Sequence, residues 1–140
     1  MIKQLLGADI QATALISPDL PLRVNLTSLE NIALIAQLHQ HASWADASQR
    51  AQQLLSVMCA DDIALKRDED LSYMQRFVVK TARAIMLKRP LILIDRPACL
   101  LPDVFYPEVL SYILSSVHDE IPHYTIVDYH WNRPLYEHTK

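Results

Sequence analysis

Three side chains able to bind ligands stand at or just beyond the ends of two apolar segments. Asp95 and Arg96 follow Leu91–Ile94, and His130 comes shortly after Tyr124–Val127. An aspartate at such a position can hold magnesium through water, an arginine can bind phosphate, and a histidine can bind a ligand. The alternative for each is structural: an aspartate hydrogen-bonded to nearby backbone or paired with Arg96, an arginine at the surface or in a salt bridge, and a histidine that caps the end of its strand. We favour the structural interpretation for all three.

The chain contains a single glycine, Gly7. Phosphate-binding loops need several glycines, because their backbone N–H groups must approach the phosphates closely and some of their residues take positive φ. No GxxxxGK sequence followed by Ser or Thr is present. The sequence therefore excludes the glycine-rich loops that bind mononucleotides and dinucleotides.

Other residues with reactive or metal-binding side chains lack the spacing that such chemistry needs. His39 and His41 are two residues apart, which on a helix places them on different faces, so we expect no metal pair. Cys59 and Cys99 have no CxxC or metal-ligand neighbour and are expected to be reduced. Ser72 lies in no GxSxG motif, and helix capping explains its position. The sequence therefore predicts neither a metal nor a cofactor.

The composition of the 140 residues is that of one soluble domain, 1–140. Hydrophobic residues make up 51% and charged residues 21% of the chain, which favours a packed core over disorder. A net charge of -3 does not favour general nucleic-acid binding. No apolar run reaches the roughly 20 residues that span a bilayer, and the N-terminal segment lacks the apolar core of a signal peptide. We therefore expect a cytoplasmic protein without membrane insertion.

The first half of the chain shows helical patterns. Thr27 and Glu30 have the spacing of a capping box, which opens a helix to about Gln40. A second helix is expected over about 43–60. The charged segment 61–70 that follows is expected to be exposed to solvent.

A second capping box, formed by Ser72 and Gln75, predicts a helix that ends near Lys88. Its periodicity predicts one buried stripe of side chains: Met74, Phe77, Val78, Thr81, Ala82 and Ile85.

The second half indicates an α/β arrangement. Leu91–Ile94 is a continuous apolar run, as expected for a central parallel strand covered on both faces. A helix is expected from Pro102–Asp103 to about His118, with Phe105, Val109, Ile113 and Val117 facing inward. Tyr124–Val127 is rich in β-branched residues and predicts a second strand, which completes a right-handed βαβ unit. Ala12–Ile16 is compatible with one more short strand.

The segment 71–97, LSYMQRFVVKTARAIMLKRPLILIDRP, resembles the ATPase domain of ABC transporters. In that family a signature sequence close to LSGGQQQRVAIARAL precedes a proline and the Walker B sequence LLLLDEP. Upstream, LTSLENIALIAQLH over 26–39 resembles the segment after the Q-loop. Downstream, YTIVDYH over 124–130 resembles the strand before the H-loop histidine. The resemblance covers about residues 14–137.

The resemblance implies a partial ABC-ATPase-like fold of the α/β class with a small parallel sheet. A mostly helical part over 26–89 would correspond to the signature subdomain, and a strand–helix–strand part over 90–140 to the Walker B and H-loop region. The P-loop segment of the family would lie before this chain begins.

The catalytic positions that the resemblance implies are mostly replaced. Asp95 matches the Walker B aspartate, which holds Mg²⁺ through water, and His130 matches the H-loop histidine. Arg96 stands where the family has the glutamate that activates water, and an arginine cannot act as a general base. The Q-loop glutamine position falls on Ser17 or Pro18.

The signature motif is similarly altered. Ser72 and Gln75 match it, but Tyr73 and Met74 replace the two glycines that let backbone amides reach a phosphate. The D-loop aspartate position falls on Pro102. The resemblance therefore implies an ATPase-like protein that does not hydrolyse ATP.

These observations favour a non-catalytic protein that acts through contacts with other proteins. The partner would be a second copy or an ABC transporter subunit, and analogy with the family suggests a lipid or solvent-resistance system. Tyr73, Met74 and Arg96 are candidate interface residues, although Tyr73 and Met74 could equally pack into the core. The Leu91–Ile94 strand also favours protein contacts, because we expect it to have an unpaired edge that another chain would cover.

Two other hypotheses remain open at this stage. Asp95, Arg96 and His130 could meet at the strand ends and form a phosphate- or nucleotide-sensing site or a small enzyme. The chain could also be a decayed product without a function of its own, although the intact capping boxes argue against decay.

Overall fold

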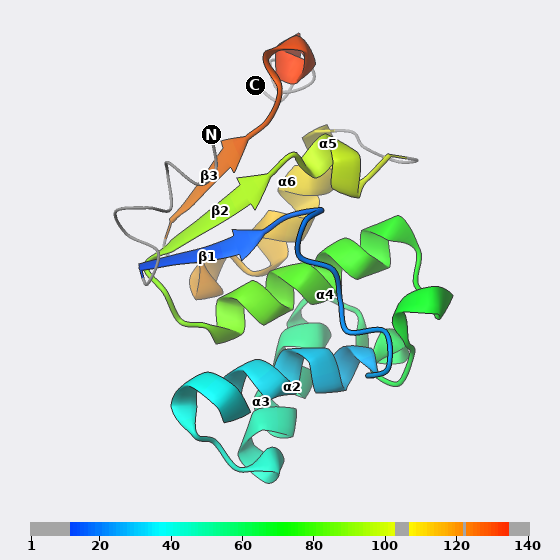
Figure 1. Ribbon diagram of the computed structural model, residues 1–140, viewed down its shortest axis with the longest axis vertical. Helices are drawn as coiled ribbons and strands as arrows, with labels where there is room; N and C mark the ends of the chain where they lie inside the picture. Colours follow the sequence, from blue (N-terminus) through cyan, green and yellow to red (C-terminus); the bar gives the residue numbers. More distant parts are fainter. Residues whose placement is uncertain (1–11, 103–106, 122, 135–140) are drawn as a thin grey trace.

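The computed structural model describes residues 12–102, 107–121 and 123–134. Its centre is a parallel sheet of three strands in the order β1 (Thr13–Ile16), β2 (Leu91–Asp95) and β3 (Tyr124–Val127). In this register Ile16 lies opposite Ile94, and Asp95 opposite Val127. The residues that follow β1, β2 and β3 therefore come together at one end of the sheet (Figure 1).

The central position of β2 contradicts one expectation from the sequence. We expected an unpaired edge on the Leu91–Ile94 strand, but β2 pairs with β1 on one side and β3 on the other. The reason is that Thr13–Ile16, which the sequence left as a tentative strand, joins the sheet as a parallel neighbour. Within the described residues the edges of the sheet are β1 and β3. Tyr124 and Thr125 of β3 are exposed.

Three helices form the part of the chain between β1 and β2: α2 (Ser28–Gln40), α3 (Trp44–Val57) and α4 (Tyr73–Met86). Figure 1 shows α4 between the sheet and the α2–α3 pair. Both predicted capping boxes are present, at Thr27 for α2 and at Ser72 for α4. The helix α3 ends three residues before the predicted end near Ala60, and Cys59 turns the chain in the left-handed region with φ 57°.

The buried stripe of α4 begins at Phe77, which is fully buried, and continues to Met86. Met74 was expected in this stripe, but its side chain is 43% exposed. The expectation was wrong because the first turn of α4, from Tyr73, remains at the surface, and packing against the core starts one turn later. The segment 61–70 is exposed as expected apart from Ile63 and Ala64, which are buried, and Asp68, which is half-buried.

The connection from β2 to β3 contains α5 (Pro97–Leu100) and α6 (Pro107–Ser116), followed by a short 3-10 helix, η4 (His118–Glu120). The expected start of a helix at 102–103 and the inward position of Phe105 lie at or within a segment outside the described residues. Ile113 of α6 and Val117, which directly follows that helix, are buried as predicted, and Val109 packs partly against the same core. None of the helices in the described ranges has the length and apolar character that a bilayer crossing requires.

Candidate functional site

Asp95 ends β2 and is 2% exposed, and both of its carboxylate oxygens are occupied by donors. The hydroxyl of Ser17 donates to Oδ2 at 2.7 Å. The guanidinium of Arg96 donates through Nε to Oδ1 at 2.9 Å and through Nη2 to Oδ2 at 2.9 Å. This two-point contact is the strongest form of arginine–carboxylate pairing. It is the Asp95–Arg96 ion pair that the sequence offered as the structural alternative.

The backbone of Arg96 directs its side chain back onto Asp95. Arg96 takes φ 49° and ψ 58°, in the left-handed region that is unfavourable for a residue with a Cβ atom. Its N–H donates to the carbonyl of Val127 at 2.6 Å, which ties the turn to the end of β3. Its Nη2 also donates to Oδ2 of Asp19 at 2.6 Å. Hydrogen bonds with the side chains of Asp95 and then Tyr129 raise the pKa of the guanidinium.

Ser17 reaches Asp95 because it directly follows β1, next to the paired Ile16 and Ile94. Its hydroxyl also accepts the N–H of Asp19 at 3.0 Å, so the chain turns immediately after the strand. The resemblance left Ser17 and Pro18 as alternatives for one family position. The structure places Ser17, not Pro18, against Asp95 by hydrogen bond.

Lys80 of α4 completes this group of residues from the other side. Its Nζ donates to the carbonyl of Ser17 at 3.2 Å, and the residue is buried. Burial lowers the pKa of Lys80, the nearby Arg83 acts in the same direction, and Asp68 and Asp19 oppose the shift. We call Ser17, Asp19, Lys80, Asp95 and Arg96 the Asp95 network.

The sequence did not indicate a role for Lys80, because this residue belongs to no recognisable motif. It stands next to Thr81 in a helix whose other buried positions, Thr81 apart, are apolar, so only its place in a buried stretch could have indicated its role. Arg83, one turn later, donates to the carbonyls of Leu20 and Pro21 at 2.7 and 3.0 Å. Through these two cations α4 holds the segment that follows β1.

The chemistry open to the Asp95 network follows from this occupancy. A metal ion at Asp95 would have to displace the guanidinium of Arg96, and no group of metal-binding side chains occurs among the described residues. At the position where the resemblance implies a water-activating glutamate, the network has Arg96, whose guanidinium also pairs with the Asp19 carboxylate. It is arranged as a structural ion pair that links the ends of β1 and β2, and Lys80, from the middle of α4, bonds the turn after β1.

The four residues at the signature-motif positions, Ser72 to Gln75, lie at the start of α4. The Ser72 hydroxyl accepts the N–H of Gln75 at 3.1 Å, and Gln75 Oε1 accepts the N–H of Ser72 at 2.9 Å, so both side chains serve the capping box. Tyr73 is 41% exposed and lies against the guanidinium carbon of Arg76 at 5.4 Å. Tyr73 and Met74 therefore do not fold into the core, which was one of the two alternatives for this pair.

His130 begins a short 3-10 helix, η5 (His130–Asn132), and is exposed. It packs edge-on against Trp131, with the ring centres 5.2 Å apart, and Trp131 stacks on Tyr129 at 4.3 Å. In the described part of the chain no hydrogen bond or ion pair joins His130 to Asp95 or Arg96. The structure thus brings two of the three candidate residues together and leaves His130 in an exposed aromatic group.

The sheet and its helices have close counterparts among solved structures. The ATP-binding cassette MJ0796, in a dimeric post-hydrolysis state bound to ADP and Pi, superimposes with a TM-score of 0.68 and 22% sequence identity. A second dimeric structure of MJ0796, a bacterial ABC transporter cassette, gives a TM-score of 0.66 and 22% identity. The matches cover 93% and 89% of this chain. No family model and no curated protein sequence matches it.

The likeness confirms the fold that the sequence motifs implied: this chain has part of the ABC ATP-binding cassette fold, with a small parallel sheet. It spans 57% and 56% of the length of the two cassettes. At 22% identity the comparison establishes fold and leaves activity to the residues of the site.

Proposed function

We propose that this chain is a non-catalytic, cytoplasmic ABC-ATPase-like protein that works through contacts with other proteins. The observation that carries the proposal is the Asp95–Arg96 pair. Arg96 stands where the resemblance implies a glutamate and fills both oxygens of the aspartate that would hold Mg²⁺ through water. A guanidinium retains its proton at any physiological pH and cannot activate water.

Other replacements support the same conclusion independently. Ser17 is bonded to Asp95 and to the Asp19 backbone, so its hydroxyl is committed to the turn after β1. At the start of α4, Tyr73 and Met74 present bulk where the resemblance implies glycines. Both side chains would obstruct a phosphate that approached the backbone amides of the helix.

Protein contacts are the function that the remaining surface favours. Tyr73 and Met74 form an exposed apolar pair, and β3 is an edge strand among the described residues. The two similar cassettes were solved as dimers. We therefore propose a homodimer, or a complex with a subunit of an ABC transport system of the kind that serves lipid transport or solvent resistance.

Two measurements on the full chain test the proposal. Thermal unfolding with Mg·ATP and Mg·ADP should show no shift of the midpoint. A shift of several degrees that disappears in Asp95→Ala would instead favour a nucleotide-sensing site. Sedimentation at micromolar concentration, alone and with a candidate transporter cassette, should show a dimer or a mixed complex. A monomer that captures no partner in a pull-down would contradict the proposed contacts.

A further inference from the structure

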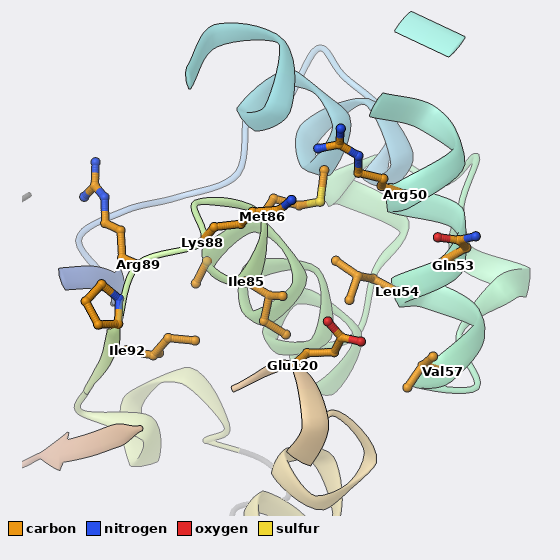
Figure 2. A pocket seen from close by; sticks show the side chains of 12 residues that line it. Arg50, Gln53, Leu54, Val57, Ile85, Met86, Lys88, Arg89, Ile92 and Glu120 are labelled. Atoms are coloured by element: carbon orange, nitrogen blue, oxygen red, sulfur yellow. The ribbon is translucent and has the colours of Figure 1, made fainter. Parts of the chain in front are cut away.

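A cavity lies at the opposite end of the strands from the Asp95 network. It has a volume of about 550 Å³ and is bounded by α3, the last turn of α4, the start of β2 and η4 (Figure 2). Ligand pockets for small molecules have volumes of about 300–1,000 Å³. None of the residues of the Asp95 network lines it, so its use does not depend on the proposed loss of catalysis.

The middle of this pocket is apolar. Leu54 of α3, Ile85 of α4 and Ile92 of β2 line it, and each is almost fully buried in the protein core. Val57, one turn after Leu54 on the same face of α3, lies at the rim and is 48% exposed. A ligand with an apolar body would cover Val57 and gain the free energy of removing that surface from water.

One side of the pocket carries positive charge. Figure 2 shows Arg50 and Lys88 on the same side as Met86, with Leu54 and Ile85 between them and the opposite side. Arg50 is held by a hydrogen bond from Nη1 to Oε1 of Gln40 at 2.9 Å. Neither cation forms an ion pair within the part of the chain that the structure describes.

The end of α4 does not require these two cations. The carbonyl of Ala84 accepts the N–H of Leu87, that of Ile85 accepts the N–H of Lys88, and that of Met86 accepts Nε2 of Gln40 at 2.7 Å. Because these last-turn carbonyls already have donors, Arg50 and Lys88 remain available to an anion. Lys88 is exposed, and its left-handed backbone, with φ 53°, ends the helix at the pocket.

Glu120 of η4 lines the opposite side of the pocket. Its carboxylate repels an anion from that side and leaves the Arg50–Lys88 side as the place for a negative group. Charge and apolar surface are therefore separated across one cavity, and a matching ligand has a negative head and an apolar body.

We propose that this pocket binds an amphipathic carboxylate with a medium-length apolar chain. The carboxylate pairs with Arg50 and Lys88, and the chain lies over Leu54 and Ile85 toward Val57. Hydrogen bonds to a charged group supply orientation, and the apolar contact supplies most of the affinity.

Calorimetric titration of the full chain with octanoate, octanol and acetate tests this site. Octanoate should bind. Octanol lacks the carboxylate and acetate lacks the apolar chain, so each should bind roughly tenfold or more weakly than octanoate. Lys88→Gln removes one cation at an exposed position and should weaken octanoate binding by about tenfold. Glu120→Gln is the matched control on the other side and should leave octanoate binding unchanged or tighter.

A steric variant tests the position of the chain. Val57→Trp fills the rim of the pocket and should abolish octanoate binding, whereas Val24→Trp, at a 69% exposed position away from the pocket, should not. Circular dichroism checks that each variant is folded. The proposal is overturned if octanoate fails to bind at millimolar concentration, binds no better than octanol, or binds equally well to Lys88→Gln or Val57→Trp.

Discussion

Arg96 holds both carboxylate oxygens of Asp95 at 2.9 Å, although the two residues are adjacent in sequence. The contact is possible because Arg96 adopts a left-handed backbone, which turns the guanidinium back toward the end of β2. An aspartate that could face solvent or a metal is thereby closed off by its own neighbour. Within the part of the ATP-binding cassette fold that this chain has, Asp95 is a buried and paired residue.

Removing the guanidinium should destabilise the protein. Arg96→Ala leaves Asp95 buried with Ser17 as its remaining side-chain donor, and we expect a loss of about 2 kcal/mol in the free energy of unfolding. Arg96→Gly loses the same pair but fits the left-handed backbone, so it should be about 1 kcal/mol more stable than Arg96→Ala. Urea denaturation measures both values. Equal stability of wild type and Arg96→Ala would show that the Asp95–Arg96 pair contributes nothing to the free energy of unfolding.

Stability at alkaline pH should report the burial of Lys80. Burial lowers the pKa of Lys80 in the folded state below the ordinary value of 10.5. As pH rises toward 10.5 the unfolded chain therefore holds more protons than the folded one, and the free energy of unfolding rises with pH. Wild type should gain stability relative to Lys80→Met over this range. A difference between the two proteins that stays flat or falls with pH would contradict the assignment.

Stability at acidic pH should report the capping box of α2. Hydrogen bonds with the backbone and then the side chain of Thr27 lower the pKa of Glu30 below 4.5. A carboxylate with a lowered pKa stabilises the fold above its ordinary pKa, and the contribution disappears on acidification. The stability advantage of wild type over Glu30→Gln should therefore shrink as pH falls below 4.5. Glu30→Gln is a close control because Gln75 serves the same role in α4.

The exposed pair at the start of α4 should matter for association and not for folding. Tyr73→Glu with Met74→Glu places charge on a surface that lies outside the core, so the free energy of unfolding should change by less than about 0.5 kcal/mol. If these residues form the interface, sedimentation should show a dimer or mixed complex in wild type and its loss in the double variant. Leu65→Glu, at an 80% exposed position in another segment, is the control. Equal association of all three proteins would exclude this surface.

Local signals in the sequence predicted most of the elements. The capping boxes at Thr27 and Ser72 located the starts of α2 and α4, because the side chains that satisfy a helix start lie within four residues of one another. The Asp95–Arg96 pair was one of the two structural alternatives for Asp95, since its two members are neighbours in sequence. The exposure of Met74 was not predicted. Periodicity shows which face of a helix is apolar, and it does not show at which turn a neighbouring element begins to cover that face.

Long-range relationships were beyond local patterns. Ser17 and Asp95 are 78 positions apart, and their contact depends on β1 pairing with β2. The same pairing removed the unpaired edge that we had expected on β2. The pocket beside Arg50 and Glu120 is lined by residues of α3, α4, β2 and η4. No spacing of residues in the sequence predicts it.

The central claim is that this chain does not hydrolyse ATP, because Arg96 occupies the carboxylate of Asp95. Phosphate release from Mg·ATP tests this claim most directly. The full chain should be assayed alone and as Asp95→Asn, which keeps the size of the side chain and removes its charge. We predict that wild type releases phosphate no faster than Asp95→Asn. Steady release by wild type that Asp95→Asn abolishes would contradict the claim.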